Sequence, residues 1–479
     1  MGAISTPSSK WTESSGVHTR RADSLESFFA VMGDIGAPFN KQHWAINSAL
    51  KLSFSKAISD LIPFLQKAWL TTRRLHPIID ATISAPDPQN PLKDFREITV
   101  PVLEPESYLE RTFFLHDTNV KDDTTLTRQL TNDHFGTIHW IPVTRELLIY
   151  VSHSQFDGIG LLMLWSGYLG ILAGLLRDGI DYKPDVGSRL TSSIDELISS
   201  PMDEGTTPEA LKLAADNMID VFLQGVPGVG LHLKSAEGAV PAHTCRRVIT
   251  LNEISTNAVI KACEKNNYSV SAIAKTALIR TPASYEQHPM AKHFSTLVPV
   301  SLRRFLPSPH DKVSYAGGVR VSGWPLLIRD VADKEFSDIA PMVNEVFRKD
   351  FSKITQDDAG NDIGLIDCTA PYSRRAIQMF TATPPPMLPP RTTPTMSSLG
   401  QVEKYIKPSY EGLMGEILSV DDFFLSLEIL NQDQYVHVWT FRNKLHFQVS
   451  ANSAHYDESF LDDEMERVND ELLLGLGVK

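Results

Sequence analysis

The sequence predicts an α/β (α+β) fold in two lobes. Strand-like and helix-like segments alternate on both sides of a stretch at residues 181–208 that is rich in Asp, Pro, Ser and Gly and is typical of a linker. We expect an N-terminal lobe over residues 1–190, a C-terminal lobe over 200–479, and a joint near Asp195. A chain of 479 residues, 42% hydrophobic and 22% charged, is long and apolar enough to bury both cores.

The first half begins with a strand, a helix and a second strand. An apolar run at 44–54 predicts a strand, 55–75 predicts an amphipathic helix that ends before Pro77, and a strand is expected through Ile78 and Ile79. Runs at 137–143 and 146–152 predict a hairpin. The uncharged residues 159–176 just reach the length of a membrane span, but they include four glycines, Ser166 and Tyr168, which favours a buried core helix.

The second half repeats the mixture of elements. Helices are expected at 208–223, 254–264 and 271–278, and strands at 247–251 and 294–299. A segment at 381–395 with six prolines predicts an extended crossover between the lobes. Strands at 423–430, 435–441 and 444–450 precede an acidic helix at 457–474, whose expected solvent-facing side consists of Asp462, Asp463, Glu464 and Glu466.

Composition excludes several function classes. With 45 Lys+Arg against 58 Asp+Glu, the formal net charge is −13 and no basic cluster is present, so we expect no nucleic-acid partner. Neither an HExxH string nor a Cys/His ligand set occurs, so we expect no metal. Three scattered cysteines, without a CxxC pair, and a start that lacks secretory features predict a cytoplasmic protein, which we expect to be a monomer without a membrane span. Gly2 and Thr6 match the loose N-myristoylation pattern, and this modification is left open.

The string HSQFDG, from His153 to Gly158, is the strongest candidate for chemistry. It ends the run LLIYVSH and opens the uncharged helix, and a strand end that feeds a helix can hold a side chain rigidly towards a cleft. A second HxxxD string, from His76 to Asp80, precedes a proline within an apolar run and is predicted to be structural. Taken alone, His153 fits a hydrogen-bonded core histidine equally well.

HSQFDG resembles the HxxxDG motif of the CoA-dependent acyltransferase superfamily, which includes chloramphenicol acetyltransferase, plant BAHD enzymes, peptide-synthetase condensation domains and fungal trichothecene O-acetyltransferases. Segments 75–77, 299–303, 397–400 and 439–457 resemble further family segments in the same order. The DFGWG string of plant BAHD enzymes is absent, so the chain looks closer to the fungal enzymes. The resemblance implies two chloramphenicol-acetyltransferase-like lobes with mixed sheets and an active-site tunnel between them.

The resemblance also implies roles for particular residues. His153 would be the general base, because a neutral imidazole can take the proton of an acceptor hydroxyl as its oxygen attacks a thioester carbonyl. Asp157 would pair with Arg303 and hold the active-site loop that includes Gly158. Ser397 or Ser398 would contact the oxyanion or the acceptor. No nucleophilic side chain is required, in keeping with the absence of a GxSxG string.

The expected function is transfer of an acetyl group from acetyl-CoA to a hydroxyl of a fungal secondary metabolite, a terpenoid, without a covalent intermediate. One alternative is a condensation-type enzyme that takes its thioester from a carrier protein and acts on an amine or hydroxyl. Another is a non-catalytic scaffold with the same fold. The sequence contains no obvious carrier or adenylation segment, which favours free acyl-CoA as the donor and a small-molecule alcohol as the acceptor.

Overall fold

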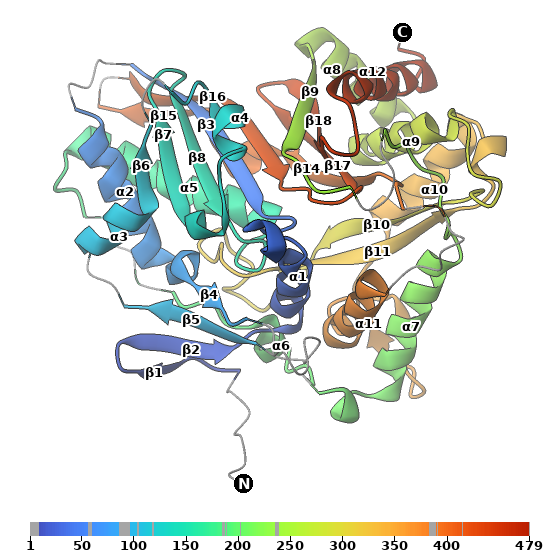
Figure 1. Ribbon diagram of the computed structural model, residues 1–479, viewed down its shortest axis with the longest axis horizontal. Coiled ribbons are helices and arrows are strands. Elements are labelled where there is room, and N and C mark those ends of the chain that lie inside the picture. The colour runs from blue at the N-terminus through green and yellow to red at the C-terminus, as the bar shows by residue number, and fades with distance from the viewer. Residues whose placement is uncertain are drawn as a thin grey trace.

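The computed structural model confirms the α/β fold class, with several sheets and helices packed on them (Figure 1). It describes residues 9–55, 60–85, 96–102, 105–116, 119–183, 187, 189–201, 203–234, 239–382, 389, 391–413 and 415–478. Residues 1–8, which include Gly2 and Thr6, lie outside the described residues, as do residues 383–388 and 390 of the predicted crossover.

A six-stranded sheet forms the centre of the first lobe, and two of its strands come from the C-terminal part of the chain. β16 pairs antiparallel with β3, from Leu418 opposite Phe54 to Leu427 opposite Ile46. This lobe is therefore not continuous in sequence, and the boundary near Asp195 remains a prediction. The strand order is β15 (Ser409–Gly412), β16 (Gly415–Leu427), β3 (Ile46–Phe54), β8 (Glu146–Val151), β7 (Thr137–Ile141) and β6 (Phe113–Leu115).

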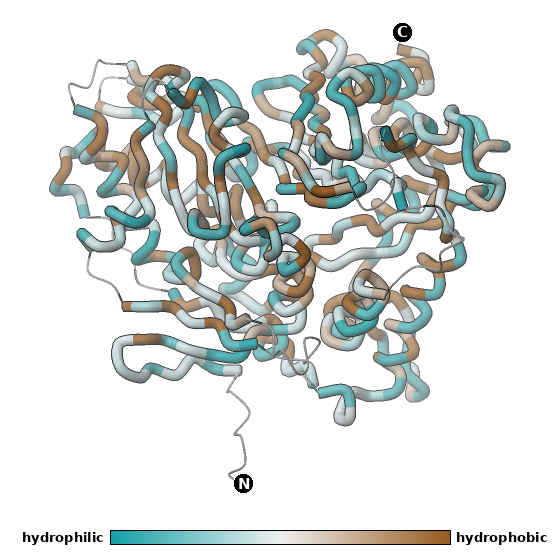
Figure 2. The backbone as a smooth tube through the Cα atoms, in the orientation of Figure 1, coloured by the Kyte–Doolittle hydropathy of each residue, from teal (hydrophilic) through white to brown (hydrophobic). Residues whose placement is uncertain are grey.

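The uncharged run is the long helix α5 (Gly158–Asp178), which packs against α2 (Ile62–Leu75), β15 and β16. It is long and apolar enough to cross a membrane by composition, but 72% of its most apolar window is buried inside the protein. This agrees with the predicted core helix, since an all-round apolar helix is stable only when it is covered on every side. Figure 2 shows hydrophobic segments along the strands of the first sheet, and others in the helices and strands of the second half.

The strand predicted through Ile78 and Ile79 is wrong. Pro77–Asp80 form a 3₁₀ turn in which the amide of Ile79 donates to the carbonyl of His76 at 3.1 Å. Proline is favoured in the first position of a helical turn because its φ is already set there, and this local preference outweighs the β propensity of two isoleucines. His76 is buried and ends α2, as expected for a structural residue.

The second lobe is built on a four-stranded sheet in which β14 runs parallel to β17 and the other pairs are antiparallel. Three helices cover it: α8 (Glu253–Lys265), α9 (Val270–Ala283) and α12 (Glu458–Gly475). The strand order is β14 (Thr395–Gln401), β17 (Gln434–Phe441), β18 (Lys444–Asn452) and β9 (Thr244–Leu251).

One predicted surface residue of α12 is inside the protein. Asp462, Asp463 and Glu466 are exposed, but Glu464 is fully buried and accepts a hydrogen bond from Nε2 of the Gln434 side chain at 2.6 Å. Burial raises the pKa of Glu464 to about 8. An acidic run on a helix places some of its members on the inner face, and here the three-residue spacing from Leu461 to Glu464 does so.

Smaller elements complete the fold around the two sheets (Figure 1). Strand β10 (Phe294–Ser301) pairs with β11 (Val321–Ile328). The remaining strands are β1 (Thr12–Ser14), β2 (Val17–Arg21), β5 (Glu97–Pro101), β4 (Thr82–Ile83), β12 (Thr355–Gln356) and β13 (Asp362–Ile363). The remaining helices are α1 (Ser24–Asp34), α3 (Pro105–Thr112), α4 (Asp123–Thr127), α6 (Ile194–Leu197), α7 (Glu209–Leu223), α10 (Phe336–Arg348) and α11 (Thr369–Thr381). All three cysteines are free and buried.

Two glycines of α5 should respond oppositely to alanine. A Cβ at Gly160 would lie 2.6 Å from the carbonyl oxygen of Ala316 and 2.7 Å from Nη2 of Arg303, whereas a Cβ at Gly170 would meet nothing within 4 Å. We expect Gly160→Ala to lower the free energy of unfolding by about 1–3 kcal/mol through overpacking. Gly170→Ala should raise it by roughly 0.5–1 kcal/mol.

Urea denaturation of both variants checks this pair of predictions. Equal stability of the two would contradict the close approach of the 316–318 segment to the start of α5.

Candidate active site

The candidate catalytic loop connects β8 to α5 and is held from the other half of the chain. His153 lies in a turn after β8, and the Oγ atoms of Ser152 and Ser154 are 2.7 Å apart. Phe156 forms a bridge with Gly318, whose amide donates to the carbonyl of Gln155 at 2.8 Å. The loop is therefore braced on both sides of His153 by hydrogen bonds.

Asp157 is the centre of the buried polar contacts at this loop. Its carboxylate accepts from Nη1 of Arg303, at 2.7 Å to each oxygen, from the amide of Gly160 at 2.8 Å, and from the amide of Arg320 at 2.6 Å. Burial alone would raise the pKa of Asp157, but the Arg303 guanidinium and the two amides outweigh it, and the pKa is lowered. With both oxygens engaged, this carboxylate acts as an anchor and has no free position for proton transfer.

His153 is stacked on Phe29 of α1. The two ring centroids are 3.9 Å apart and the planes differ by 6°. Burial lowers the pKa of His153 to about 4, against the opposing effects of its own main chain and of Asp157. Its Nδ1 is buried, so Nε2 is the nitrogen that can face the adjoining space. A neutral imidazole in this orientation can accept a proton from a bound hydroxyl.

His153 borders a cavity of about 250 Å³ whose wall comes from both halves of the chain. Gly158, Ser397 and Ser398 also lie in this wall, so the structure brings every predicted site residue except Arg303 to the cavity, and Arg303 lies behind Asp157. The hydroxyl of Ser398 already has a hydrogen-bond partner, since its Oγ lies 2.7 Å from Oγ of Ser271. The wall includes seven aromatic side chains: Phe28, Phe29, Trp44, Phe222, Tyr372, Phe380 and Tyr435.

The charged side chains of this wall are paired with one another or with neighbours. Arg391 contacts Asp433 at 3.0 Å and lies over the ring of Phe380, and Arg320 contacts Asp23 at 3.2 Å. Asp157 is bound as described above. Among the described wall residues, the cavity thus offers aromatic surface and neutral hydrogen-bonding groups, which suits an uncharged ligand more than an ionic one.

Sequence reasoning missed His437. This residue of β17 lies in the cavity wall, is 2% exposed, and has an Nδ1 without a hydrogen-bond partner. Burial, and then the proximity of His153, lower its pKa to about 3. The string YVHVW contained a signal for this residue, because side chains alternate between the two faces of a strand. The valines on either side of the histidine belong to an apolar core, so the histidine faces the opposite side of the sheet.

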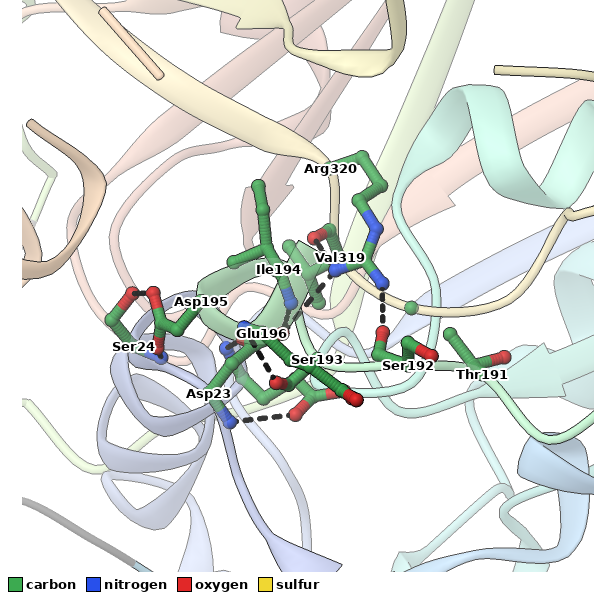
Figure 3. Close-up of polar contacts among 12 residues, drawn as sticks. Asp23, Ser24, Thr191, Ser192, Ser193, Ile194, Asp195, Glu196, Val319 and Arg320 are labelled. Carbon is green, nitrogen blue, oxygen red and sulfur yellow. Dashed lines mark hydrogen bonds and ion pairs between the residues drawn. The ribbon is translucent and has the colours of Figure 1, made fainter. Parts of the chain in front are cut away.

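Arg320, whose amide donates to Asp157, also contacts α1 and the 191–196 segment through its guanidinium (Figure 3). Nη1 of Arg320 donates to Asp23, the N-cap of α1, and Asp23 also accepts from the amide of Ile194 at 2.8 Å. Ser24 donates to Asp195 through its amide and its hydroxyl, at 2.9 and 3.0 Å. Burial and the neighbouring Glu26 raise the pKa of Asp23 to about 7, although Arg320 opposes them. Residues 192–195 of the stretch predicted as a linker are therefore part of a buried network.

A second group of possible ligands lies outside the cavity. His243, Cys245 and Glu458 place one ligand atom each within 4.8 Å of one another. Arg247 and Arg128 both contact Glu458, so its charge is already compensated, and burial raises the pKa of the Cys245 thiol to about 11. Because two guanidinium groups adjoin this group, we do not assign a metal to it.

Comparison with known proteins gives relatives over the full length of the chain, while no family model matches. The acetyltransferase pigO of Monascus ruber is 25% identical over 98% of both chains. The O-acetyltransferase pigM of the same fungus is 23% identical over 92% of this chain and 82% of its own. The loline biosynthesis cluster 1 transcription factor lolU1 of Epichloe uncinata is 26% identical over 98% of this chain and 97% of its own.

Solved structures agree on the fold. The trichothecene 15-O-acetyltransferase TRI3 from Fusarium sporotrichioides superposes with a TM-score of 0.77 at 14% identity, covering 98% of each chain. The first condensation domain of the CDA synthetase gives a TM-score of 0.64 at 13% identity, covering 95% of each chain. The protein thus has the fold of the CoA-dependent acyltransferase superfamily, and its full-length relatives include fungal acetyltransferases.

Proposed function

We propose that this protein is an O-acetyltransferase that moves an acetyl group from acetyl-CoA to a hydroxyl of a fungal secondary metabolite. The observation that carries the proposal is His153, which borders the cavity between the two halves of the chain while Asp157 and Arg303 hold its loop from behind. The relatives named as acetyltransferases and the fold shared with TRI3 support the same reaction class.

In this mechanism His153 takes the proton of the acceptor hydroxyl through Nε2 as the hydroxyl oxygen attacks the thioester carbonyl carbon. A new C–O bond forms, the C–S bond breaks, and His153 returns its proton to the thiolate that leaves. Asp157 keeps the loop in place without touching the substrate. General-base assistance of this kind contributes roughly 10²–10⁴-fold to the rate.

The cavity wall limits the acceptor. Aromatic side chains and paired charges favour a largely apolar, uncharged molecule with an accessible hydroxyl. A terpenoid fits this description and is the class we propose first, in view of the trichothecene acetyltransferase among the structural neighbours. An azaphilone is a second class to test, because one relative is named an azaphilone biosynthesis cluster protein.

Two other functions have specific observations in their favour. The condensation domains among the structural neighbours favour a carrier-protein thioester as donor. The name of lolU1 favours a role in transcription, but a net charge of −13 opposes binding to the phosphate backbone. A monomeric, cytoplasmic enzyme without metal remains part of the proposal.

Replacement of His153 tests the reaction directly. We expect His153→Ala to reduce thiol release from acetyl-CoA by about 10²–10⁴-fold, because the general base is lost, while the melting temperature stays close to that of the wild type. Purified protein is assayed with a free-thiol reagent against panels of hydroxylated terpenoids and azaphilones. Near wild-type turnover by the variant would refute the base assignment, and activity that appears only with an acylated carrier protein would refute free acetyl-CoA as donor.

The pH dependence provides a second test. Only the neutral imidazole can act as base, and burial holds the pKa of His153 near 4, so the base stays neutral well below the usual pKa of about 6.5. We therefore expect kcat/KM to be level between pH 6 and 8 and to decline only towards pH 4. Initial rates are measured alongside intrinsic fluorescence, which reports unfolding. An acid limb centred near pH 6.5 would contradict the desolvated environment of His153.

Neutralising Asp157 should affect stability as well as rate. Asp157→Asn leaves the buried Arg303 without its counter-charge, and breaking a buried pair in this way costs about 3–5 kcal/mol. Since the folded-state pKa of Asp157 is lowered, the wild-type advantage is present above the unfolded pKa of about 3.9 and is lost as the pH falls below it.

Asp178→Asn is the matched control for Asp157→Asn, because Asp178 pairs with Arg177 at the exposed far end of the same helix. Its stability should barely change. Urea denaturation at pH 7 compares the two variants, and similar stabilities for both would argue against the anchoring role of Asp157.

A further inference from the structure

Four residues of the cavity wall have a buried side-chain nitrogen or oxygen without a hydrogen-bond partner among the described residues: Trp44, His153, Tyr372 and His437. His437 is the one of these that faces His153 from the second sheet. Several other polar groups of the wall are engaged: Ser295 donates to the carbonyl of Phe222 at 2.7 Å, Thr393 donates to that of Val229 at 2.8 Å, and Ser398 pairs with Ser271. Neither ring nitrogen of His437 has a hydrogen bond to a described residue. Buried polar groups are nearly always paired, so an unpaired one at a cavity indicates a position prepared for a ligand.

The fold holds His437 towards the cavity. It lies in β17, between β14 and β18, opposite Ser397 on one side and Gln448 on the other. The adjacent Val436 and Val438 point to the opposite face, into the core beneath α9 and α12. With strands on both sides and Nδ1 buried, Nε2 is the ring nitrogen left to meet a bound molecule.

His437 and His153 share this cavity and interact electrostatically. Both imidazoles are neutral at physiological pH because burial lowers the pKa of each. A neutral imidazole carries one N–H donor and one lone pair. One ring can therefore accept a proton while the other donates a hydrogen bond, and neither places a fixed charge in the apolar cavity.

We propose that His437 is a catalytic hydrogen-bond donor, whose Nε2–H holds the carbonyl oxygen of the bound thioester and the negative charge that grows on this oxygen during attack. The inference rests on the proposed acetyl transfer and deepens it. His437 donates a hydrogen bond without losing its proton, so the acceptor's proton still passes through His153 to the departing thiolate. This assigns to His437 the contact that sequence resemblance gave to Ser397 or Ser398.

The test variant is His437→Leu, which removes the donor and keeps an apolar side chain of similar bulk. Loss of one donor to an oxyanion lowers kcat by about 10²–10³-fold. Because the replaced group is buried and unpaired, the melting temperature should stay the same or rise. The readout is thiol release from acetyl-CoA, with an acceptor from the panels or with water as a slow acceptor. His437→Gln restores an N–H donor and should regain at least tenfold of the lost rate.

His446→Leu is the matched control. His446 is also buried in the same sheet, stacked on Trp439 with centroids 5.1 Å apart, but it is absent from the cavity wall. This variant should change the melting temperature more than kcat. A His437→Leu protein as active as the wild type, or one whose lost rate His437→Gln does not restore, would overturn the inference while acetyl transfer stands. A wild-type protein with no thioester turnover at all would overturn the proposed function, and the inference with it.

Discussion

The buried carboxylate of Asp157 is the interaction on which the site depends. It caps α5 through the amide of Gly160, and it binds Arg303 and the amide of Arg320 from the second half of the chain. A single charged group thereby holds the start of the long apolar helix α5 and joins it to the 303–320 region. Removal of such a charge from water is costly, and the contacts with Arg303 and the two amides compensate this cost.

The contacts of Asp157 also help to hold the ring of His153 in place. The guanidinium of Arg320 donates to Asp23, the N-cap of α1 (Figure 3), and the amide of Arg320 donates to Asp157. Phe29 of α1 lies flat against the imidazole of His153. The His153 ring is thus held from its own loop and from a helix more than a hundred residues earlier in the chain. Stacking prevents rotation of the ring, and rigid support from surrounding contacts is what a proton-transfer group requires.

Local patterns predicted the parts of this arrangement that depend on neighbouring residues. The run LLIYVSH and the uncharged segment after it predicted β8, the turn at His153 and α5, because strand and helix periodicity are local properties. The addition of β16 to the first sheet and the stacking of Phe29 on His153 join distant segments, so no periodicity could reveal them. His437 combines a local and a distant feature. Its strand and the face on which it lies could be predicted from the sequence, but the cavity that it faces is formed by distant segments and exists only after folding.

The low pKa of His153 limits how the proposed reaction can proceed. An imidazole with a pKa of about 4 is too weak a base to form a free alkoxide before attack. Proton transfer must therefore accompany C–O bond formation, when the attacking oxygen becomes far more acidic than in the free alcohol. Charge then develops on the carbonyl oxygen in a cavity whose fixed charges are already paired. A neutral donor aimed at that oxygen is the group such a site needs, because it stabilises the transition state without adding a charge that the empty cavity would have to keep buried.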